Sequence, residues 1–244
     1  ALEMAAGDFV LLADHDDTLP EHAFYEVVKA LNEHRGCDVL YSDEDKLDMD
    51  GKALFDPHFK PDFNPDLLTS VNYICHLFVV KKSILDQVGG FRQEFDGAQD
   101  YDFIFRCTEK AKEIVHIPKV LYHWRCHQNS TASNPESKLY AFEAGSRAIM
   151  AHYERMGIQA EGVEKGVDYG IYHTRFKIKG EPLVTVIIPN KDHSRDLDTC
   201  VRSILERSSY RNLEFIIVEN NSTQQETFDY YRKMEEAHPC FRVV

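Results

Sequence analysis

Three aspartates directly follow an apolar run. Asp14, Asp16 and Asp17 come after residues 9–13, whose sequence is Phe-Val-Leu-Leu-Ala. Carboxylates this close repel one another unless a cation lies between them, and hard oxygen ligands suit Mg²⁺ or Mn²⁺. The spacing therefore predicts a site for one of these two ions.

A buried strand is expected to position these carboxylates. A short Val, Leu and Phe run between polar residues is typical of a strand buried on both faces. Open α/β sheets bind their ligands at the carboxyl ends of such strands. We therefore expect the three aspartates to lie at the edge of a cleft.

Three interpretations of the acidic motif remain open from these residues alone. Residues 14–18, Asp-His-Asp-Asp-Thr, fit the Asp-x-Asp-x-Thr signature of haloacid-dehalogenase-type phosphatases, in which the first Asp, here Asp14, is the nucleophile. They also resemble the Asp-x-Asp motif of GT-A glycosyltransferases, which holds a divalent ion against the diphosphate of a sugar nucleotide. The third interpretation is a solvated turn before a helix that starts near Pro20.

Composition indicates an ordinary globular chain. It has 244 residues, 43% hydrophobic and 28% charged, and a net charge of -13. That charge argues against nucleic acid or an anionic membrane surface as the main partner. Six scattered cysteines form no Cys-x-x-Cys pair, which favours reduced, cytosolic thiols. No apolar run approaches the ~20 residues of a membrane span. The two ends of the sequence suggest a piece of a longer polypeptide.

Hydrophobic periodicity predicts alternating helices and strands up to about residue 178. Residues 44–66 contain three prolines and few apolar positions, so we expect a long loop that acts as a lid or binding surface. The other predicted elements are helices at 21–35, 83–88, from 97 onward and at 136–156, and strands at 37–42, 73–80, 114–117, 120–124, 158–163 and 169–178.

The sequence changes character at residues 179–182, Lys-Gly-Glu-Pro. A β-rich run at 183–189, a helix, a strand at 213–218 and a helix at 223–237 follow, and this alternation implies a parallel sheet. We therefore expect two domains, at residues 1–180 and 181–244.

Several spaced motifs together resemble family 2 glycosyltransferases of the GT-A fold, the inverting enzymes that build bacterial surface polysaccharides. The matching segments are the acidic motif at 14–16, Gly-Gly-Phe at 89–91, Gln-Asp-Tyr-Asp at 99–102 and Leu-Tyr-His-Trp-Arg at 121–125. Residues 41–46, 59–62 and 72–73 further resemble the O-antigen and rhamnan-type branch. The family usually has Glu-Asp where this chain has Gln99 and Asp100.

The resemblance implies an α/β fold of the GT-A (Rossmann-like) type, with a mostly parallel central sheet flanked by helices. Residues 1–125 resemble the second, metal- and acceptor-binding half of such a domain, and residues 183–244 the first, nucleotide-binding half of another copy. A tandem transferase cut at its junction would give this order. The two halves could also assemble with each other in circularly permuted order, which is a further hypothesis.

The resemblance also implies roles for individual residues. Asp100 corresponds to the catalytic base, and a bound Mn²⁺ or Mg²⁺ is expected on Asp14, Asp16 and His123. Nucleotide contacts are expected from Pro189, Asn190, Glu219 and Asn221, although Asn190 replaces the usual Thr and Glu219 the usual Asp. Acceptor or sugar contacts are expected from Asn72, Tyr73, Trp124, Arg125 and His127.

The implied function is metal-dependent, inverting transfer of a sugar from a UDP- or dTDP-sugar to a glycan or lipid-linked glycan. The expected location is the cytoplasm, at the inner face of the membrane, with peripheral association through the full-length protein. A non-catalytic carbohydrate- or nucleotide-binding module is the competing function. The phosphatase is disfavoured because Asp17 occupies that family's usual glycine and no downstream Lys and Asp-Asp pair is evident.

Overall fold

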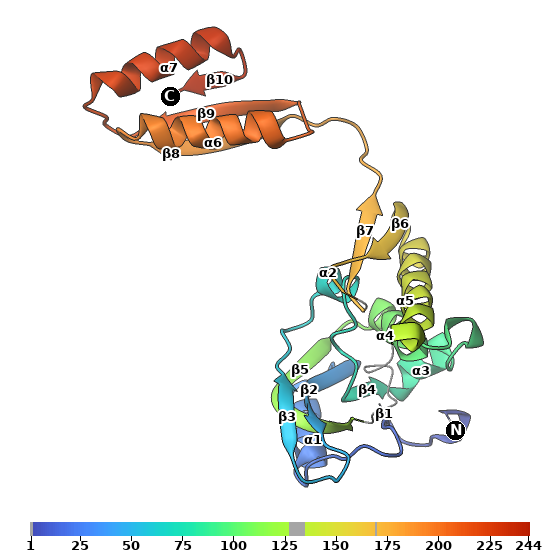
Figure 1. Cartoon of the computed structure of the whole chain (residues 1–244). Coiled ribbons are helices and arrows are strands. Elements are labelled where there is room, and N and C mark those ends of the chain that lie inside the picture. Colours follow the sequence, from blue (N-terminus) through green and yellow to red (C-terminus); the bar gives the residue numbers. More distant parts are fainter. Residues whose placement is uncertain (1, 127–134, 169) are drawn as a thin grey trace. The chain divides into compact units, whose positions relative to one another are not determined.

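The computed structural model describes residues 2–126, 135–168 and 170–244, which fold as two compact units (Figure 1). The first unit comprises residues 1–177 and the second residues 178–244. His127, one of the expected acceptor contacts, lies outside the described residues. Two expectations stay predictions. One is that the two units are halves of two transferase domains, and the other is that these halves assemble in circularly permuted order.

A five-stranded mixed sheet forms the centre of the first unit. β4 pairs antiparallel with β1 and with β2, β3 pairs antiparallel with β2, and β5 pairs parallel with β2. The strands are β1 (Phe9–Leu12), β2 (Val39–Leu47), β3 (Leu54–His58), β4 (Phe78–Lys81) and β5 (Ile114–Arg125). β1, β2 and β5 therefore run in one direction, and β4 runs in the other.

Helices cover both faces of this sheet because its residues alternate between two cores. Val39 and Tyr41 on β2 join the core under α3, α4 and α5, whereas Leu40 joins the core under α1. These helices are α1 (Ala23–Glu33), α3 (Lys82–Val88), α4 (Gln99–Lys110) and α5 (Pro135–Met156). Short helices η1 (Leu2–Met4), α2 (Pro65–Leu68) and η2 (Gln93–Phe95) complete the unit's helical elements in the described residues.

Three details of the sheet differ from the expectations. β1 pairs with β4 alone in the described residues and is half-buried, so it is an edge strand and not a strand buried on both faces. The expected loop at 44–66 contains the end of β2 and all of β3, whose residues are exposed and lack an apolar pattern. β5 passes through Pro118 unbroken, because the pairing register shifts beside it between Ser42 and Asp43.

α5 and the hairpin of β6 (Ala160–Lys165) and β7 (Tyr172–Phe176) close the first unit. Tyr172 stacks on Phe142 of α5, with ring centroids 5.1 Å apart, and packs near Tyr101 of α4. Gly145 lies directly beneath the Tyr172 hydroxyl, and a Cβ at position 145 would overlap it. The helix and the hairpin are therefore fitted together at this glycine.

The second unit is a three-stranded parallel sheet in the order β10-β9-β8. α6 and α7 pack on the same core as Phe215 and Ile217 of the central strand. The elements are β8 (Val184–Asn190), α6 (Ser194–Arg207), β9 (Leu213–Glu219), α7 (Gln225–Ala237) and β10 (Phe241–Val243). This strand-helix alternation is the one predicted from the sequence.

The chain thus has the predicted α/β class, with a central sheet flanked by helices. The predicted mostly parallel pairing describes the second unit, but in the described part of the first unit only β2 and β5 pair in parallel. The antiparallel insertion of β4 between β1 and β2 causes this difference. Among the described residues, none of the helices combines the length and apolarity that a membrane crossing requires.

Candidate active site

Strand direction brings the polar motifs of the first unit to one edge of the sheet. β1, β2 and β5 end there, while β4 begins there after residues 72–76. The acidic turn folds back onto β5, where the backbone groups of Thr18 and His123 exchange hydrogen bonds of 3.2 and 2.9 Å. This edge therefore gathers residues 14–18, the second half of β2, residues 72–76 and the end of β5.

Asp100 lies at the start of α4, in a cavity of about 620 Å³. Its Oδ2 accepts a hydrogen bond of 2.9 Å from Nδ2 of Asn72. Asn72, Cys75 and Trp124 line the same cavity, and so do Phe142 and residues 170–172 of the region after β5. The expected catalytic base and two expected acceptor contacts thus share one pocket.

Burial raises the pKa of Asp100 above its ordinary value. The charge of His76 and the hydrogen bonds from the Tyr101 backbone and from Asn72 oppose this effect without cancelling it. A carboxylate whose pKa rises toward neutrality is a stronger proton acceptor. The environment of Asp100 therefore suits general-base chemistry.

The acidic turn is held by the end of β5. Asp17 accepts hydrogen bonds at both carboxylate oxygens, 2.6 Å from the Tyr122 hydroxyl and 2.7 Å from the backbone N–H of Arg125. The Tyr122 oxygen in turn accepts a 3.0 Å hydrogen bond from the backbone N–H of Asp14. Asp17 consequently fixes the shape of the turn, and Asp14 remains exposed at its lip.

Asp14, Asp17 and His76 form a group that could hold a metal ion. Each offers one ligand atom, and these atoms all lie within 4.8 Å of one another. Nε2 of His76 is 3.9 Å from Oδ2 of Asp14. Of the expected ligands, Asp14 belongs to this group, whereas Asp16 and His123 do not.

The side chains of Asp16 and His123 have other neighbours. Asp16 Oδ1 is 3.7 Å from Nδ1 of the exposed His15. His123 Nδ1 is 2.5 Å from Oδ1 of Asp45 on β2, because the two residues are paired across the parallel strands. A metal site on Asp14, Asp16 and His123 therefore stays a prediction, and the geometry adds Asp17 and His76 as candidates.

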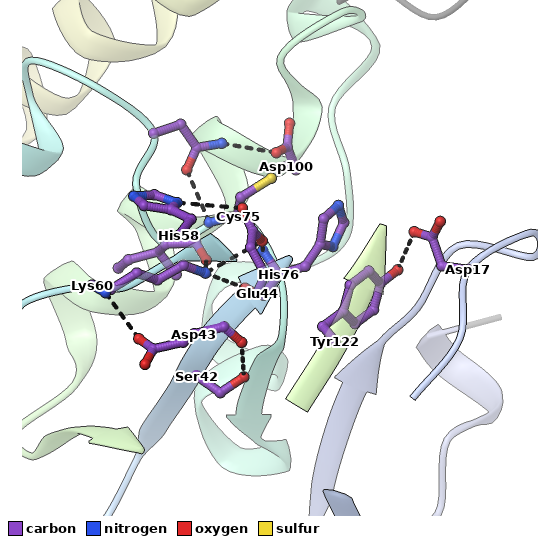
Figure 2. Close-up of polar contacts among 12 residues, drawn as sticks. Asp17, Ser42, Asp43, Glu44, His58, Lys60, Cys75, His76, Asp100 and Tyr122 are labelled. Atoms are coloured by element: carbon purple, nitrogen blue, oxygen red, sulfur yellow. Dashed lines mark hydrogen bonds and ion pairs between the residues drawn. The ribbon is translucent and has the colours of Figure 1, made fainter. Parts of the chain in front are cut away.

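His76 lies between the acidic turn and Asp100. Its ring stacks on that of Tyr122, with centroids 4.5 Å apart and planes inclined by 9°. Figure 2 shows His76 between Asp100 on one side and the Tyr122–Asp17 hydrogen bond on the other. Burial raises the pKa of the neighbouring Cys75 thiol well above its ordinary value, and Asp100 and Asp14 both add to that rise. Both carboxylates are thus within electrostatic reach of residues 75–76.

The other expected acceptor contacts are placed differently. The Arg125 side chain donates to the backbone oxygens of Asp16, Asp48 and Met49, at 2.6, 3.3 and 3.3 Å, so it braces two turns. Tyr73 is buried, and its hydroxyl accepts a 2.9 Å hydrogen bond from the Asn64 N–H. These two residues do not line the Asp100 cavity, unlike Asn72 and Trp124.

The second unit has its own cavity of about 640 Å³ at the ends of its strands. Pro189 and Asn190, both expected nucleotide contacts, line it together with Asn220 and Lys191. Asn190 also donates a 2.7 Å hydrogen bond from its Nδ2 to the Tyr231 hydroxyl.

Glu219 and Asn221 are not among the lining residues of this cavity. The Glu219 carboxylate accepts hydrogen bonds from Ser222, at both its N–H and its hydroxyl, and from the Tyr231 hydroxyl at 2.7 Å. Asn221 adopts a positive φ of 57° in the turn that follows β9. Whether Glu219 and Asn221 contact a nucleotide stays a prediction.

Sequence reasoning missed His76 and the structural role of Asp17. His76 stands inside a predicted strand, where a histidine gives no signal of its own, and strand β4 begins only at Phe78. Lys46, which lines the Asp100 cavity, belongs to the motif at 41–46, and that motif assigns it no individual role. The signal that could have found His76 is its position four residues after Asn72, in a segment that carries several polar residues before an apolar run.

The chain is similar in sequence to several known proteins. It is 41% identical over 222 residues, 91% of its length, to the O-antigen biosynthesis protein RfbC of Myxococcus xanthus. It is also 41% identical, over an alignment of 246 residues that covers 100% of the chain, to the uncharacterized protein y4gI of Sinorhizobium fredii. It spans only 17% and 27% of these two relatives, respectively.

More distant similarities are found as well. The chain is 23% identical over 132 residues, 54% of its length and 14% of the relative, to chondroitin synthase of Pasteurella multocida. Among solved structures, TarS of S. aureus in complex with UDP-GlcNAc covers 62% of this chain and 44% of its own, at 21% identity and a TM-score of 0.46. No family model matches the chain.

Proposed function

We propose that this chain contributes to a glycosyltransferase that transfers a sugar with inversion from a nucleotide-sugar donor, a UDP- or dTDP-sugar, to a glycan or lipid-linked glycan. The polysaccharide context rests on the name of the Myxococcus xanthus relative. The observation that carries the proposal is the placement of Asp100, a carboxylate with a raised pKa in a cavity lined by Cys75, whose neighbour His76 lies 3.9 Å from Asp14 of the acidic turn.

The chemistry requires a base and a source of positive charge. The base removes the proton of the attacking hydroxyl, and positive charge stabilises the departing diphosphate. In this chain Asp100 is the proposed base, oriented by Asn72. Asp14 and its neighbours would hold Mn²⁺ or Mg²⁺, which would supply the positive charge when bound.

Turnover of a defined donor tests the proposal. We expect the chain to release nucleoside diphosphate from UDP- or dTDP-sugars when Mn²⁺ is present, and to stop releasing it when EDTA removes the ion. Water would serve as the acceptor in this assay. A melting temperature raised by UDP or dTDP only together with Mn²⁺ would support the same site. Hydrolysis of a simple phosphate ester that is lost on Asp14→Asn would instead indicate the phosphatase.

A non-catalytic binding module is the second candidate. Its supporting observation is that the expected metal and acceptor residues belong to the first unit, whereas the expected nucleotide residues belong to the second, where Pro189 and Asn190 line a separate cavity. Metal-dependent stabilisation by a nucleotide, with no diphosphate release from any donor, would favour this function over the transferase.

The acidic turn allows a direct test of the metal ligands. If the geometric group holds the ion, Asp17→Asn should weaken Mn²⁺ binding roughly 10-fold or more, because one anionic ligand is lost, and Asp16→Asn should change it little. Isothermal titration with MnCl₂ measures both variants. The opposite ranking, with Asp16→Asn the weaker binder, would favour the set of Asp14, Asp16 and His123.

A further inference from the structure

A buried ion pair holds the segment that connects Asp100 with the acidic turn. The Lys60 side chain is fully buried, and its ammonium group is 3.3 Å from Oε2 of Glu44 on β2. The ammonium also donates to the backbone oxygens of Ile74, at 2.7 Å, and of His76. All three ammonium protons are therefore used within the protein.

Glu44 holds the other side of the same residue. Its Oε2 accepts a 3.1 Å hydrogen bond from the backbone N–H of His76, and its Oε1 is 3.5 Å from Nδ1 of His58. Figure 2 shows Lys60 and Glu44 meeting at the backbone of residues 75–76. The N–H and the carbonyl of His76 are thus bound by the two partners of one ion pair.

The electrostatics agree with a charged pair. Burial alone would raise the pKa of Glu44, but the His58 contact and the charges of Lys60 and His76 outweigh it and hold that pKa below its ordinary value. Burial lowers the pKa of Lys60, and Glu44 opposes this change. A buried pair of this kind is weak evidence for stability, because desolvation offsets much of the attraction. A role in fixing local geometry is therefore worth testing.

Lys60 is itself fixed by β2. Its backbone N–H donates a 2.9 Å hydrogen bond to Oδ1 of Asp43, which also lies 2.8 Å from Nε2 of His116. The Tyr41 hydroxyl donates a 2.6 Å hydrogen bond to the backbone oxygen of Pro61. The motifs at 41–46 and 59–62 thus lock together, although neither lines the Asp100 cavity except through Lys46.

We infer that Lys60 and Glu44 are positioning residues, which hold residues 72–76 so that Asn72 orients Asp100 and His76 faces Asp14. The inference rests on the proposed function for its catalytic consequence. Its structural part stands alone, because the backbone of Cys75 adopts a positive φ of 36° between the two bound carbonyls. A non-glycine residue in that conformation persists only where its surroundings hold it.

We call the hold of Lys60 and Glu44 on residues 72–76 the clamp. The reactivity of the Cys75 thiol measures the clamp directly. Cys75 is partly exposed as a residue, whereas Cys37 and Cys107 are buried in the two cores of the same unit. In Lys60→Met we expect alkylation of Cys75 by iodoacetamide, followed by peptide mass spectrometry, to be about 10-fold faster than in the wild type, because the segment opens locally. Cys37 and Cys107 should stay protected, and the exposed Cys200 gives the reference rate.

A second variant distinguishes local opening of residues 72–76 from unfolding of the whole unit. Lys60→Met leaves the Glu44 carboxylate buried without its cation, which is strongly destabilising. The double variant Glu44→Gln/Lys60→Met removes that charge, and the glutamine oxygen can still accept from the His76 N–H. Lys119→Met is the matched control, since Lys119 forms a 2.6 Å ion pair with Glu26 at the surface and should leave every labelling rate unchanged.

Donor turnover by the variants shows whether Lys60 and Glu44 position Asp100 for catalysis or only stabilise the fold. In the double variant we expect kcat for donor hydrolysis to fall about 10-fold or more with little change in the donor KM, because the base is misoriented while donor contacts remain. Cys75 labelling at the wild-type rate in both variants, or faster labelling of all three protected thiols together, would overturn the clamp. Fast Cys75 labelling in the double variant together with an undiminished kcat would show that the clamp has no part in catalysis. If the wild type has no turnover, the proposed function fails while the labelling still decides the clamp.

Discussion

Asp100→Asn is expected to lower donor turnover by roughly 10²- to 10⁴-fold, the usual contribution of a positioned general base. The amide keeps the size of the side chain, and its oxygen can still accept the Asn72 hydrogen bond, but it cannot take the proton of the attacking hydroxyl. The measurement is diphosphate release from a UDP- or dTDP-sugar at saturating Mn²⁺. Stabilisation by the free nucleotide should be unchanged, because binding does not need the base.

Asp96→Asn is the control for this prediction, since Asp96 is an exposed carboxylate four residues earlier and should leave turnover unaffected. The pH profile adds a second readout. Since the pKa of Asp100 is raised, the base becomes protonated, and turnover falls, already above the ordinary aspartate pKa of 3.8 as the pH is lowered. Full activity of Asp100→Asn, or an activity that persists unchanged through that range, would remove Asp100 from the mechanism.

Arg106→Met is expected to destabilise the first unit by about 3–5 kcal/mol, because it removes the hydrogen-bonded cation of the buried Asp102 carboxylate and leaves only the more distant Arg155, at 3.8 Å. Nε of Arg106 donates a 2.8 Å hydrogen bond to Asp102, and its other nitrogens donate to the backbone oxygens of Val88 and Gly90. Asp102 is fully buried, and its Oδ1 makes no hydrogen bond of its own. Urea unfolding followed by the fluorescence of Trp124, the single tryptophan, reports on this unit alone.

Lys82→Met is the matched control within the same unit. Lys82 and Asp86 have the same four-residue spacing on α3 as Asp102 and Arg106 on α4, but they form a solvent-accessible pair. Exposed pairs of this type contribute roughly 0.5 kcal/mol or less. A similar loss of stability in both variants would mean that burial does not set the strength of the Asp102–Arg106 pair.

Much of the fold was predictable because its helices and buried strands carry strong periodicity. The predicted helices at 21–35 and 136–156 correspond to α1 and α5, and the strand-helix alternation after residue 183 was correct. β3 was missed because its residues are exposed on both faces and include Pro57, so no apolar alternation marks it. The antiparallel place of β4 was missed because strand order depends on contacts between distant segments.

The candidate site was predictable as a set of segments but not as a set of contacts. The sequence placed Asp14 and Asp100 in motifs, and the structure brings both to the 75–76 segment. It could not show that Asp17 accepts from Tyr122, more than 100 residues away, or that His76 faces Asp14. It also gave no indication that residues 170–172 would line the Asp100 cavity, because that hairpin lies outside every motif.

The contact between Gly145 and Tyr172 has an evolutionary consequence. A side chain at 145 would collide with the phenol ring, so the two positions cannot vary independently. We expect homologous chains that keep an aromatic residue at the hairpin position to retain glycine on the helix, and chains that gain alanine or serine on the helix to carry a smaller hairpin partner. Such paired substitutions would show which homologous chains keep Tyr172 as part of the lining of the Asp100 cavity.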